Sequence, residues 1–90
     1  MKVSSGTIFF IAVLILSNSP VFAQSVAEFS KIISADHNND KAYTNRALAY
    51  TRMGDLTDAI SDLTQAIEIN PKNAVAYYVR GTIYYTQGVS

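Results

Sequence analysis

A pattern of tyrosine, arginine and small residues occurs twice in this chain. The first copy reads Tyr43-x-x-Arg46-Ala47-x-x-Tyr50, and the second, 34 positions later, reads Tyr77-x-x-Arg80-Gly81-x-x-Tyr84. Self-similarity at such a period is typical of helical repeats, in which each unit buries one face against its neighbours. The period therefore predicts a stack of repeated units and not a fold built around one central core.

Two apolar stripes at helical spacing identify the first helix pair. One runs from Ala42 to Met53 and the other from Leu56 to Ile69. Gly54 can adopt the left-handed backbone that ends a helix, and Asp55 can cap the next one. Pro71 ends the second helix, because proline disfavours helix at the residue before it. The sequence thus predicts a tight helix-turn-helix.

Further helices are expected on both sides of this pair. Asn73 can cap a third helix, whose stripe ends near Gly88. Before Tyr43, the segment from Ser25 to Asp36 matches the second helix of the pair when it is shifted by one period. The shift aligns Val26 with Ile60, Glu28 with Asp62, Phe29 with Leu63 and Ile33 with Ile67. Four helices are therefore predicted after residue 23.

The Tyr-x-x-Arg-Ala-x-x-Tyr spacing, the Ala59-x-x-x-Leu63 pair and Pro71 together resemble a tetratricopeptide repeat. The resemblance implies an all-α fold of antiparallel helix-turn-helix repeats, an α-solenoid of about two repeats. Residues 24–39 would be the second helix of a degenerate half repeat, 40–73 a complete repeat, and 74–90 the first helix of a further, incomplete one. Tyr43 replaces the family's usual tryptophan, Arg46 replaces leucine, Ala47 replaces glycine and Leu63 replaces phenylalanine. Only Arg46 changes the chemical character of its position, from apolar to charged.

Small residues are expected where the paired helices cross, because they let the two backbones approach. Ala47 should therefore face Ala59. The residues predicted to pack the repeats are Tyr43, Ala47, Tyr50, Ala59, Leu63, Ala66, Pro71, Tyr77, Gly81 and Tyr84.

The arginines repeat with the same period as two acidic residues. Arg80 follows Arg46, and Asp62 follows Glu28, each by 34 positions. We predict that each arginine meets an acidic residue of a neighbouring helix. The alternative is a pair of solvated arginines, for which ion pairing contributes only about 0 to 1 kcal/mol.

The first 23 residues have the pattern of a secretory signal peptide. Lys2 gives a positive start, Ile8 to Leu16 is an unbroken apolar run, and Val21-Phe22-Ala23 ends in a small residue at a cleavage position. Cleavage would leave an exported chain, periplasmic or secreted, that starts at Gln24 and has no membrane segment. An uncleaved anchor or a buried strand is the alternative, but the run is short of the roughly 20 residues that a spanning helix needs.

The composition argues against several classes of function. Seven basic and seven acidic residues balance, so no basic field exists to attract nucleic acid. Without cysteine there is no thiolate nucleophile or cysteine metal site. The single histidine, His37, lies in an Asp/Asn cluster typical of turns and caps, which lacks the glycine and glutamate of a calcium loop. We expect no enzyme, no metal and no cofactor.

The resemblance implies a binding scaffold for a protein or peptide, with its concave surface lined by the first helix of each repeat. It places Lys41, Thr44, Asn45, Leu48, Thr51 and Arg52 on that surface, followed by Val75, Tyr78, Val79, Thr82 and Tyr85. Asn45, Arg52, Tyr78 and Tyr85 are the predicted partner contacts, because tyrosine combines apolar area with a polar tip. Packing of the two tyrosines against a following helix is the alternative. The family's carboxylate clamp is matched only by Asn45, so capture of chaperone tails is not predicted.

A second hypothesis concerns the last helix. Gly81 and Tyr84 would suit a crossing with a paired helix, yet the sequence stops at Ser90 before one could begin. About three repeats are usually needed for a continuous solenoid core. The open helix could therefore belong to a fragment of a longer protein, mediate self-association as a homo-oligomer, or accept a helix from a partner.

Overall fold

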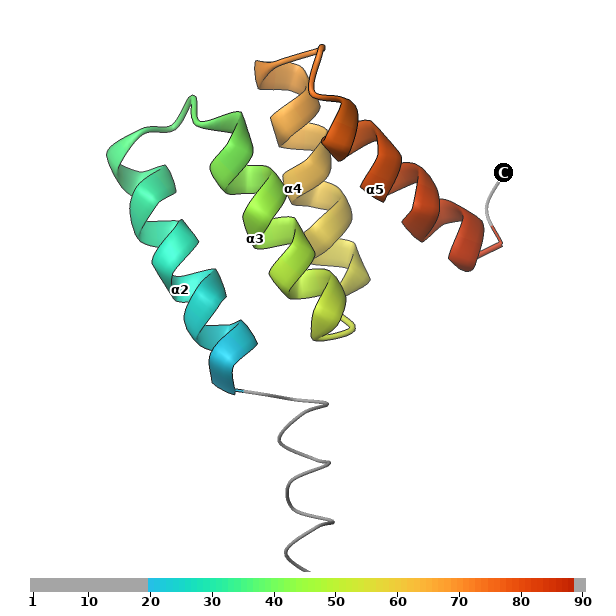
Figure 1. Ribbon diagram of the computed structural model, residues 1–90, viewed down its shortest axis with the longest axis horizontal. Helices are drawn as coiled ribbons and strands as arrows, with labels where there is room; N and C mark the ends of the chain where they lie inside the picture. The colour runs from blue at the N-terminus through green and yellow to red at the C-terminus, as the bar shows by residue number, and fades with distance from the viewer. Residues whose placement is uncertain (1–19, 89–90) are drawn as a thin grey trace, which may run out of the picture.

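The computed structural model describes residues 20–88, which form four helices: α2 (Pro20–Ala35), α3 (Asp40–Arg52), α4 (Leu56–Ile69) and α5 (Ala74–Thr86). Figure 1 shows them as successive antiparallel helices, with α3 packed against both α2 and α4, and α4 packed against α5. The all-α helix-turn-helix architecture is therefore confirmed. No helix within residues 20–88 combines the length and the apolar character needed to cross a membrane.

The first helix of the described residues extends further toward the N-terminus than the sequence pattern indicates. It starts at Pro20, whereas the match to α4 begins near Ser25. Proline fits the first turn of a helix, where its missing N–H would have no partner. Most of the predicted signal peptide, residues 1–19, lies outside the described residues, while Val21, Phe22 and Ala23 belong to the first turns of α2.

The helix ends repeat as regularly as the helices do. Asn39 Oδ1 accepts a hydrogen bond from the Ala42 N–H at 3.0 Å, and Asn73 Oδ1 accepts one from the Ala76 N–H at 2.9 Å. Asp55 caps α4 in the same way. Gly54 follows α3 with φ of 81° and, one period on, Gly88 follows α5 with φ of 76°. Both are in the left-handed region that glycine adopts without a steric penalty.

Small side chains form the centre of the molecule. Ala47, Ala59, Leu63, Ala66 and Ala76 are fully buried in one cluster, and Ile83 is nearly so. The predicted crossing partners Ala47 and Ala59 both lie in it, so α3 and α4 can approach closely. Larger side chains pack around this centre, namely Tyr43, Tyr50, Leu56, Ile60, Ile67 and Val79.

The predicted packing residues of α5 are in a different environment from those of α3. Tyr77 is 46% exposed, Tyr84 is half-buried, and Gly81 is exposed, with nothing within 4 Å of the place a Cβ would take. Pro71 is exposed in the turn before α5. Within residues 20–88, α5 packs on α4 and over a short stretch on α3. The role of these four residues in repeat packing therefore stays a prediction.

Candidate protein-interaction surface

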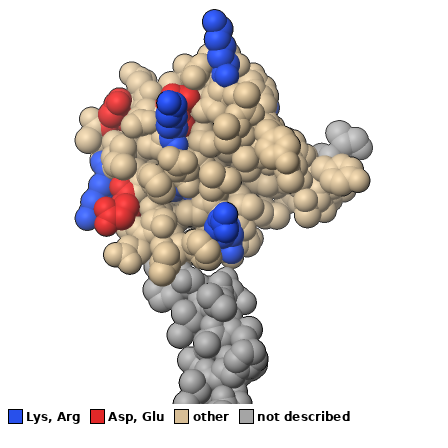
Figure 2. Space-filling view, viewed as in Figure 1, with Lys and Arg blue, Asp and Glu red and all other residues tan. Residues whose placement is uncertain are grey.

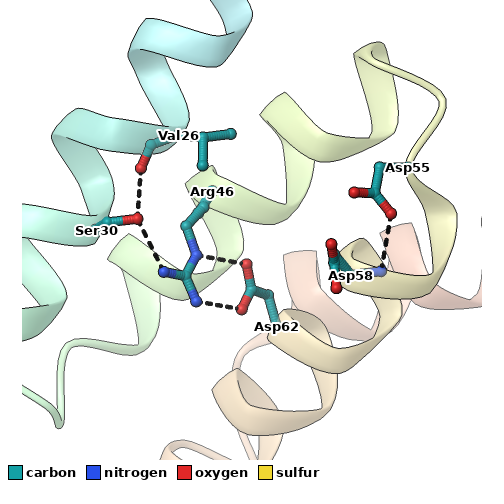
Figure 3. A network of polar contacts seen from close by, with 6 residues as sticks. All are labelled: Val26, Ser30, Arg46, Asp55, Asp58 and Asp62. Atoms are coloured by element: carbon teal, nitrogen blue, oxygen red, sulfur yellow. Dashed lines mark hydrogen bonds and ion pairs between the residues drawn. The ribbon is translucent and has the colours of Figure 1, made fainter.

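One arginine joins the first three described helices. Arg46 on α3 donates two hydrogen bonds to Asp62 on α4, from Nε at 2.8 Å and from Nη2 at 2.7 Å. Its Nη1 donates to Ser30 Oγ on α2 at 3.0 Å, and Ser30 in turn donates to the Val26 carbonyl (Figure 3). This geometry fixes the positions of α2 and α4 relative to α3, and so the shape of the surface that the helices present.

The ion pair is largely shielded from water. Asp62 is 5% exposed, and the guanidinium of Arg46 lies 5.7 Å from the ring centre of Tyr43 and 5.9 Å from that of Tyr50. Hydrogen bonding to Asp62 raises the pKa of Arg46 above its usual value, although burial opposes the shift. The predicted contact of this arginine with an acidic residue is confirmed.

The same prediction is wrong for Arg80. Its Nη1 donates to Thr64 Oγ1 at 3.1 Å, and no acidic side chain of residues 20–88 forms an ion pair with it. Thr64 and Ser30 are one period apart, so the hydroxyl contact on the preceding helix is repeated. The carboxylate contact is not, because Asp62 lies on the helix after α3 and no helix follows α5 in the described residues.

The first hollow lies between the start of α3 and the turn before α5. It measures about 370 Å³ and is lined by Asp40, Lys41, Thr44, Asn45, Asn70, Lys72, Asn73 and Val75. Asp40 Oδ2 accepts hydrogen bonds from Asn70 Nδ2 at 3.1 Å and from Asn73 Nδ2 at 2.8 Å. Asn73 Nδ2 also donates to Thr44 Oγ1 at 3.0 Å. This network holds the polar wall of the hollow in place.

The second hollow lies between α2 and α3. It measures about 180 Å³ and is lined by Phe22, Ser25, Phe29, Asn45, Leu48, Ala49 and Arg52. The guanidinium of Arg52 lies 5.8 Å from the ring centre of Phe22. The lining thus combines two aromatic rings with an exposed cation and an amide. Asn45 borders both hollows, so they adjoin along α3.

The predicted partner contacts fall into two groups. Asn45 and Arg52 are exposed on α3 and come together in the second hollow. Tyr78 is 75% exposed and Tyr85 is 85% exposed on α5, and neither lines either hollow. The surface therefore offers a grooved part on α3 and an aromatic part on α5.

Sequence reasoning did not assign a binding role to the residues of the α4–α5 turn. Asn70, Lys72 and Asn73 line the first hollow, although their pattern indicates only turn and cap residues. One signal was available: Asn70-x-x-Asn73 repeats Asp36-x-x-Asn39 one period later, which places it beside the start of α3 in a stacked fold. Phe22 was missed because it lies in the segment interpreted as a signal peptide.

The remaining charged groups are spread over the surface. On the face shown in Figure 2 the Lys and Arg side chains are separate from one another. His37 is exposed in the turn after α2, and residues 20–88 contain no group of three His, Cys, Asp or Glu side chains placed to hold a metal ion. At the start of α4, hydrogen bonding and charge from Asp55 raise the pKa of Asp58.

Antiparallel helix pairs that stack in sequence order, with caps and left-handed glycines recurring at one period, define a helical repeat protein of the α-solenoid class. Two family models match it: one described as TPR repeat at residues 48–88, and one described as tetratricopeptide repeat at residues 28–61. Together the two models cover residues 28–88, which carry tetratricopeptide repeats.

Several curated proteins are similar to the chain over part of their length. Hsp70-Hsp90 organizing protein 3 of Arabidopsis thaliana is 31% identical over 64 residues, which are 71% of this chain and 12% of that protein. Tetratricopeptide repeat protein 13 of Homo sapiens is 33% identical over 64% of this chain and 7% of its own length. Small glutamine-rich tetratricopeptide repeat-containing protein 2 of Mycosarcoma maydis is 30% identical over 74% of this chain and 19% of its own length. No solved structure matches the chain. The chain thus spans less than a fifth of each of these relatives.

Proposed function

We propose that this protein is an exported, non-catalytic interaction module that binds a polypeptide partner along α3 and α5. The observation that carries the proposal is the pair of hollows that adjoin at Asn45, next to a helix with two highly exposed tyrosines. Similarity to tetratricopeptide-repeat proteins supports it, because repeats of this kind form extended surfaces used for binding.

The two hollows differ in chemistry and would contact different parts of an extended segment. In the first, Lys41 and Lys72 border a wall of amide and hydroxyl groups, which suits backbone carbonyls or an acidic side chain. In the second, Phe29 and Leu48, which cleavage after Ala23 would retain, suit an apolar side chain, with Arg52 at the edge. A ligand with an acidic and an apolar residue a few positions apart fits this order.

The proposal does not extend to the tails of chaperones. Four of the similar proteins carry Hsp70 and Hsp90 in their names. The carboxylate-clamp pattern is matched here only by Asn45, so the side chains needed to capture a terminal carboxylate are not present at the corresponding positions.

Export is proposed on the signal-peptide pattern of residues 1–23. Cleavage after Ala23 would remove Phe22, so the second hollow would lose one aromatic ring and Arg52 would lose the ring beneath it. Mass spectrometry of the protein recovered from the medium or periplasm should give a chain that starts at Gln24. An intact Met1 in membrane-bound material would contradict cleavage and release of the chain.

The binding proposal can be tested with peptides selected from a random phage-displayed library on the purified protein. Arg52→Ala and Tyr78→Ala should each weaken the selected peptide by at least about fivefold, the equivalent of roughly 1 kcal/mol. Lys31→Ala, on the exposed face of α2, serves as the control and should leave the dissociation constant unchanged. Unchanged affinity in both test variants, or a library that yields no binder, would overturn the proposal.

A further inference from the structure

The outer helices α5 and α2 match the inner helices α3 and α4, respectively, when the sequence is shifted by one period. Equivalent positions nevertheless differ in burial. In α3, Ala47 is completely buried against α4. Its counterpart one period later in α5 is Gly81, which is exposed with an open space around the Cβ position. The face of α5 that corresponds to the α4-facing side of α3 is therefore free within residues 20–88.

The same comparison holds between α4 and α2. Asp62 and Ala66 of α4 are 5% and 0% exposed, and Asp62 is bound to Arg46 of α3. Their counterparts in α2 are Glu28, which is exposed, and Ile32, which is 42% exposed. Among the described residues, α2 thus corresponds to the second helix of a repeat whose first helix is absent. Helix α5 corresponds to the first helix of a repeat whose second helix is absent.

The two free faces carry complementary charges in the matching position. Arg46 pairs with Asp62 across the α3–α4 contact. The counterparts are Arg80 on α5 and Glu28 on α2, and neither has an ion-pair partner in residues 20–88. Arg80 donates from Nη1 to Thr64, just as Arg46 donates from Nη1 to Ser30. Nε and Nη2 of Arg80 therefore remain available for a carboxylate, and these are the two groups with which Arg46 binds Asp62.

We propose that α5 of one copy packs on α2 of a second copy in the way that α3 packs on α4, with Arg80 bound to Glu28 of the next copy. Gly81 would take the place of Ala47 at the crossing. Ser25, Phe29 and Ile32 would take the places of Ala59, Leu63 and Ala66. A second copy is the occupant that the chain itself specifies, because both halves of the contact are present on one molecule.

This contact is head-to-tail and lies beyond the proposed peptide binding. The two faces differ and lie on the outer helices at opposite ends of the stack (Figure 1). A pair of copies therefore leaves one free face at each end, and association continues to larger species as concentration rises. The first hollow, built from α3 and the α4–α5 turn, is not used in the contact, whereas Ser25 and Phe29 of the second hollow are, so a peptide in the second hollow would compete with a second copy.

Sedimentation velocity over a range of concentrations tests the proposal, on protein whose N-terminus has been defined by mass spectrometry. The unmodified chain should associate beyond dimers. Arg80→Glu and Glu28→Arg should each weaken association by at least about tenfold, since each places like charges opposite one another. Glu68→Arg, a reversal at an exposed residue of α4, is the matched control and should associate like the unmodified chain.

A charge exchange separates the specific pair from a general effect of charge or misfolding. An equimolar mixture of the Arg80→Glu and Glu28→Arg proteins should associate again, because each face then meets one of opposite sign. The double variant Arg80→Glu/Glu28→Arg should associate by itself. Gly81→Glu should block association even in the double variant, while circular dichroism shows that each variant keeps its helices.

A monomer at every concentration, or charge reversals with no effect, would overturn the proposal. So would a mixture that fails to associate while its components are folded, or an unmodified monomer that instead takes up a helix of another protein. The selected-peptide assay is read separately. A monomer that still binds the peptide would contradict only the self-association. Because association would cover Ser25 and Phe29 of the second hollow, the proposed function is judged on the dispersed Arg80→Glu variant. Failure of that variant to bind any peptide would contradict only the proposed function.

Discussion

Arg46 and Asp62 form a bidentate ion pair across the contact between α3 and α4, with distances of 2.8 and 2.7 Å. The carboxylate is 5% exposed, so few water molecules could replace the arginine as its partner. A buried charge that loses its partner retains its desolvation penalty. The pair therefore matters more for what its disruption costs than for the net stability it adds.

Asp62→Asn should lower the free energy of unfolding by about 2 kcal/mol, because it leaves the guanidinium of Arg46 with a neutral partner. Urea denaturation at low and at high salt measures the effect, which should persist at high salt because the pair is shielded. Glu68→Gln, at an exposed residue of α4, is the control and should stay within about 0.5 kcal/mol. Equal stability of Asp62→Asn and the unmodified chain at both salt concentrations would refute this role.

The two asparagine caps allow a matched comparison. Asn39 accepts the capping hydrogen bond of α3, whereas Asn73 caps α5 and also donates to Asp40 and Thr44. Loss of a cap alone costs about 1 kcal/mol. Asn73→Ala should therefore destabilise the protein more than Asn39→Ala, by roughly a further 1 kcal/mol. Chemical denaturation of both variants measures the difference, and equal losses would show that the links to Asp40 and Thr44 add nothing.

Equivalent positions in α3 and α5 should respond in opposite directions to a larger side chain. Ala47 is completely buried, so Ala47→Leu should overpack the crossing and cost about 1 to 3 kcal/mol. Gly81 has free space at its Cβ position, and Gly81→Ala should stabilise α5 by roughly 0.8 kcal/mol through helix propensity. Thermal unfolding at a concentration low enough to keep the protein dispersed gives both values. A loss of stability in Gly81→Ala would indicate a covered face.

Tyr50 should ionise later than an unperturbed tyrosine. Burial raises its pKa above 10.0, and the nearby charge of Arg46 only partly offsets the shift. The folded state thus holds the phenol proton more tightly than the unfolded state does. The resulting contribution to stability is complete below about pH 10 and is lost as the pH rises through the folded-state value. A titration followed by phenolate absorbance should show a separate step at high pH, the late step, which belongs to Tyr50.

Tyr50→Phe identifies that step, because the late absorbance change should disappear while the changes of the other tyrosines remain. Tyr85→Phe is the control, since Tyr85 is 85% exposed. A late step that survives in Tyr50→Phe would assign it to another residue.

Sequence reasoning was most successful where structure is local or strictly periodic. Asp55, Asn73 and Gly54 contact only near neighbours when they start or end a helix, so short-range rules predict them. The Arg46–Asp62 contact also follows from the sequence, because the period places the two residues on adjacent helices. Periodicity failed for Arg80, since a repeated residue keeps its repeated environment only where the next helix is present.

The hollows were beyond sequence reasoning for a different reason. Asp40 meets Asn70 and Asn73 across 30 and 33 positions, so the wall of the first hollow depends on how helices stack. Tyr78 and Tyr85 illustrate the converse. The family resemblance and the chemistry of tyrosine suggested contact residues, but exposure alone says nothing about whether a groove lies beside them.

The links from Asp40 to Asn70 and Asn73 have a mechanical consequence. They tie the start of α3 to the turn before α5, and no comparable side-chain hydrogen bond joins the Gly54 and Gly88 ends of these helices within residues 20–88. The stack is therefore stiffer along the edge that contains Asp40 than along the edge that contains Gly54 and Gly88. Bending should change the angle between α3 and α5 by opening the Gly54 side, while the first hollow keeps its shape.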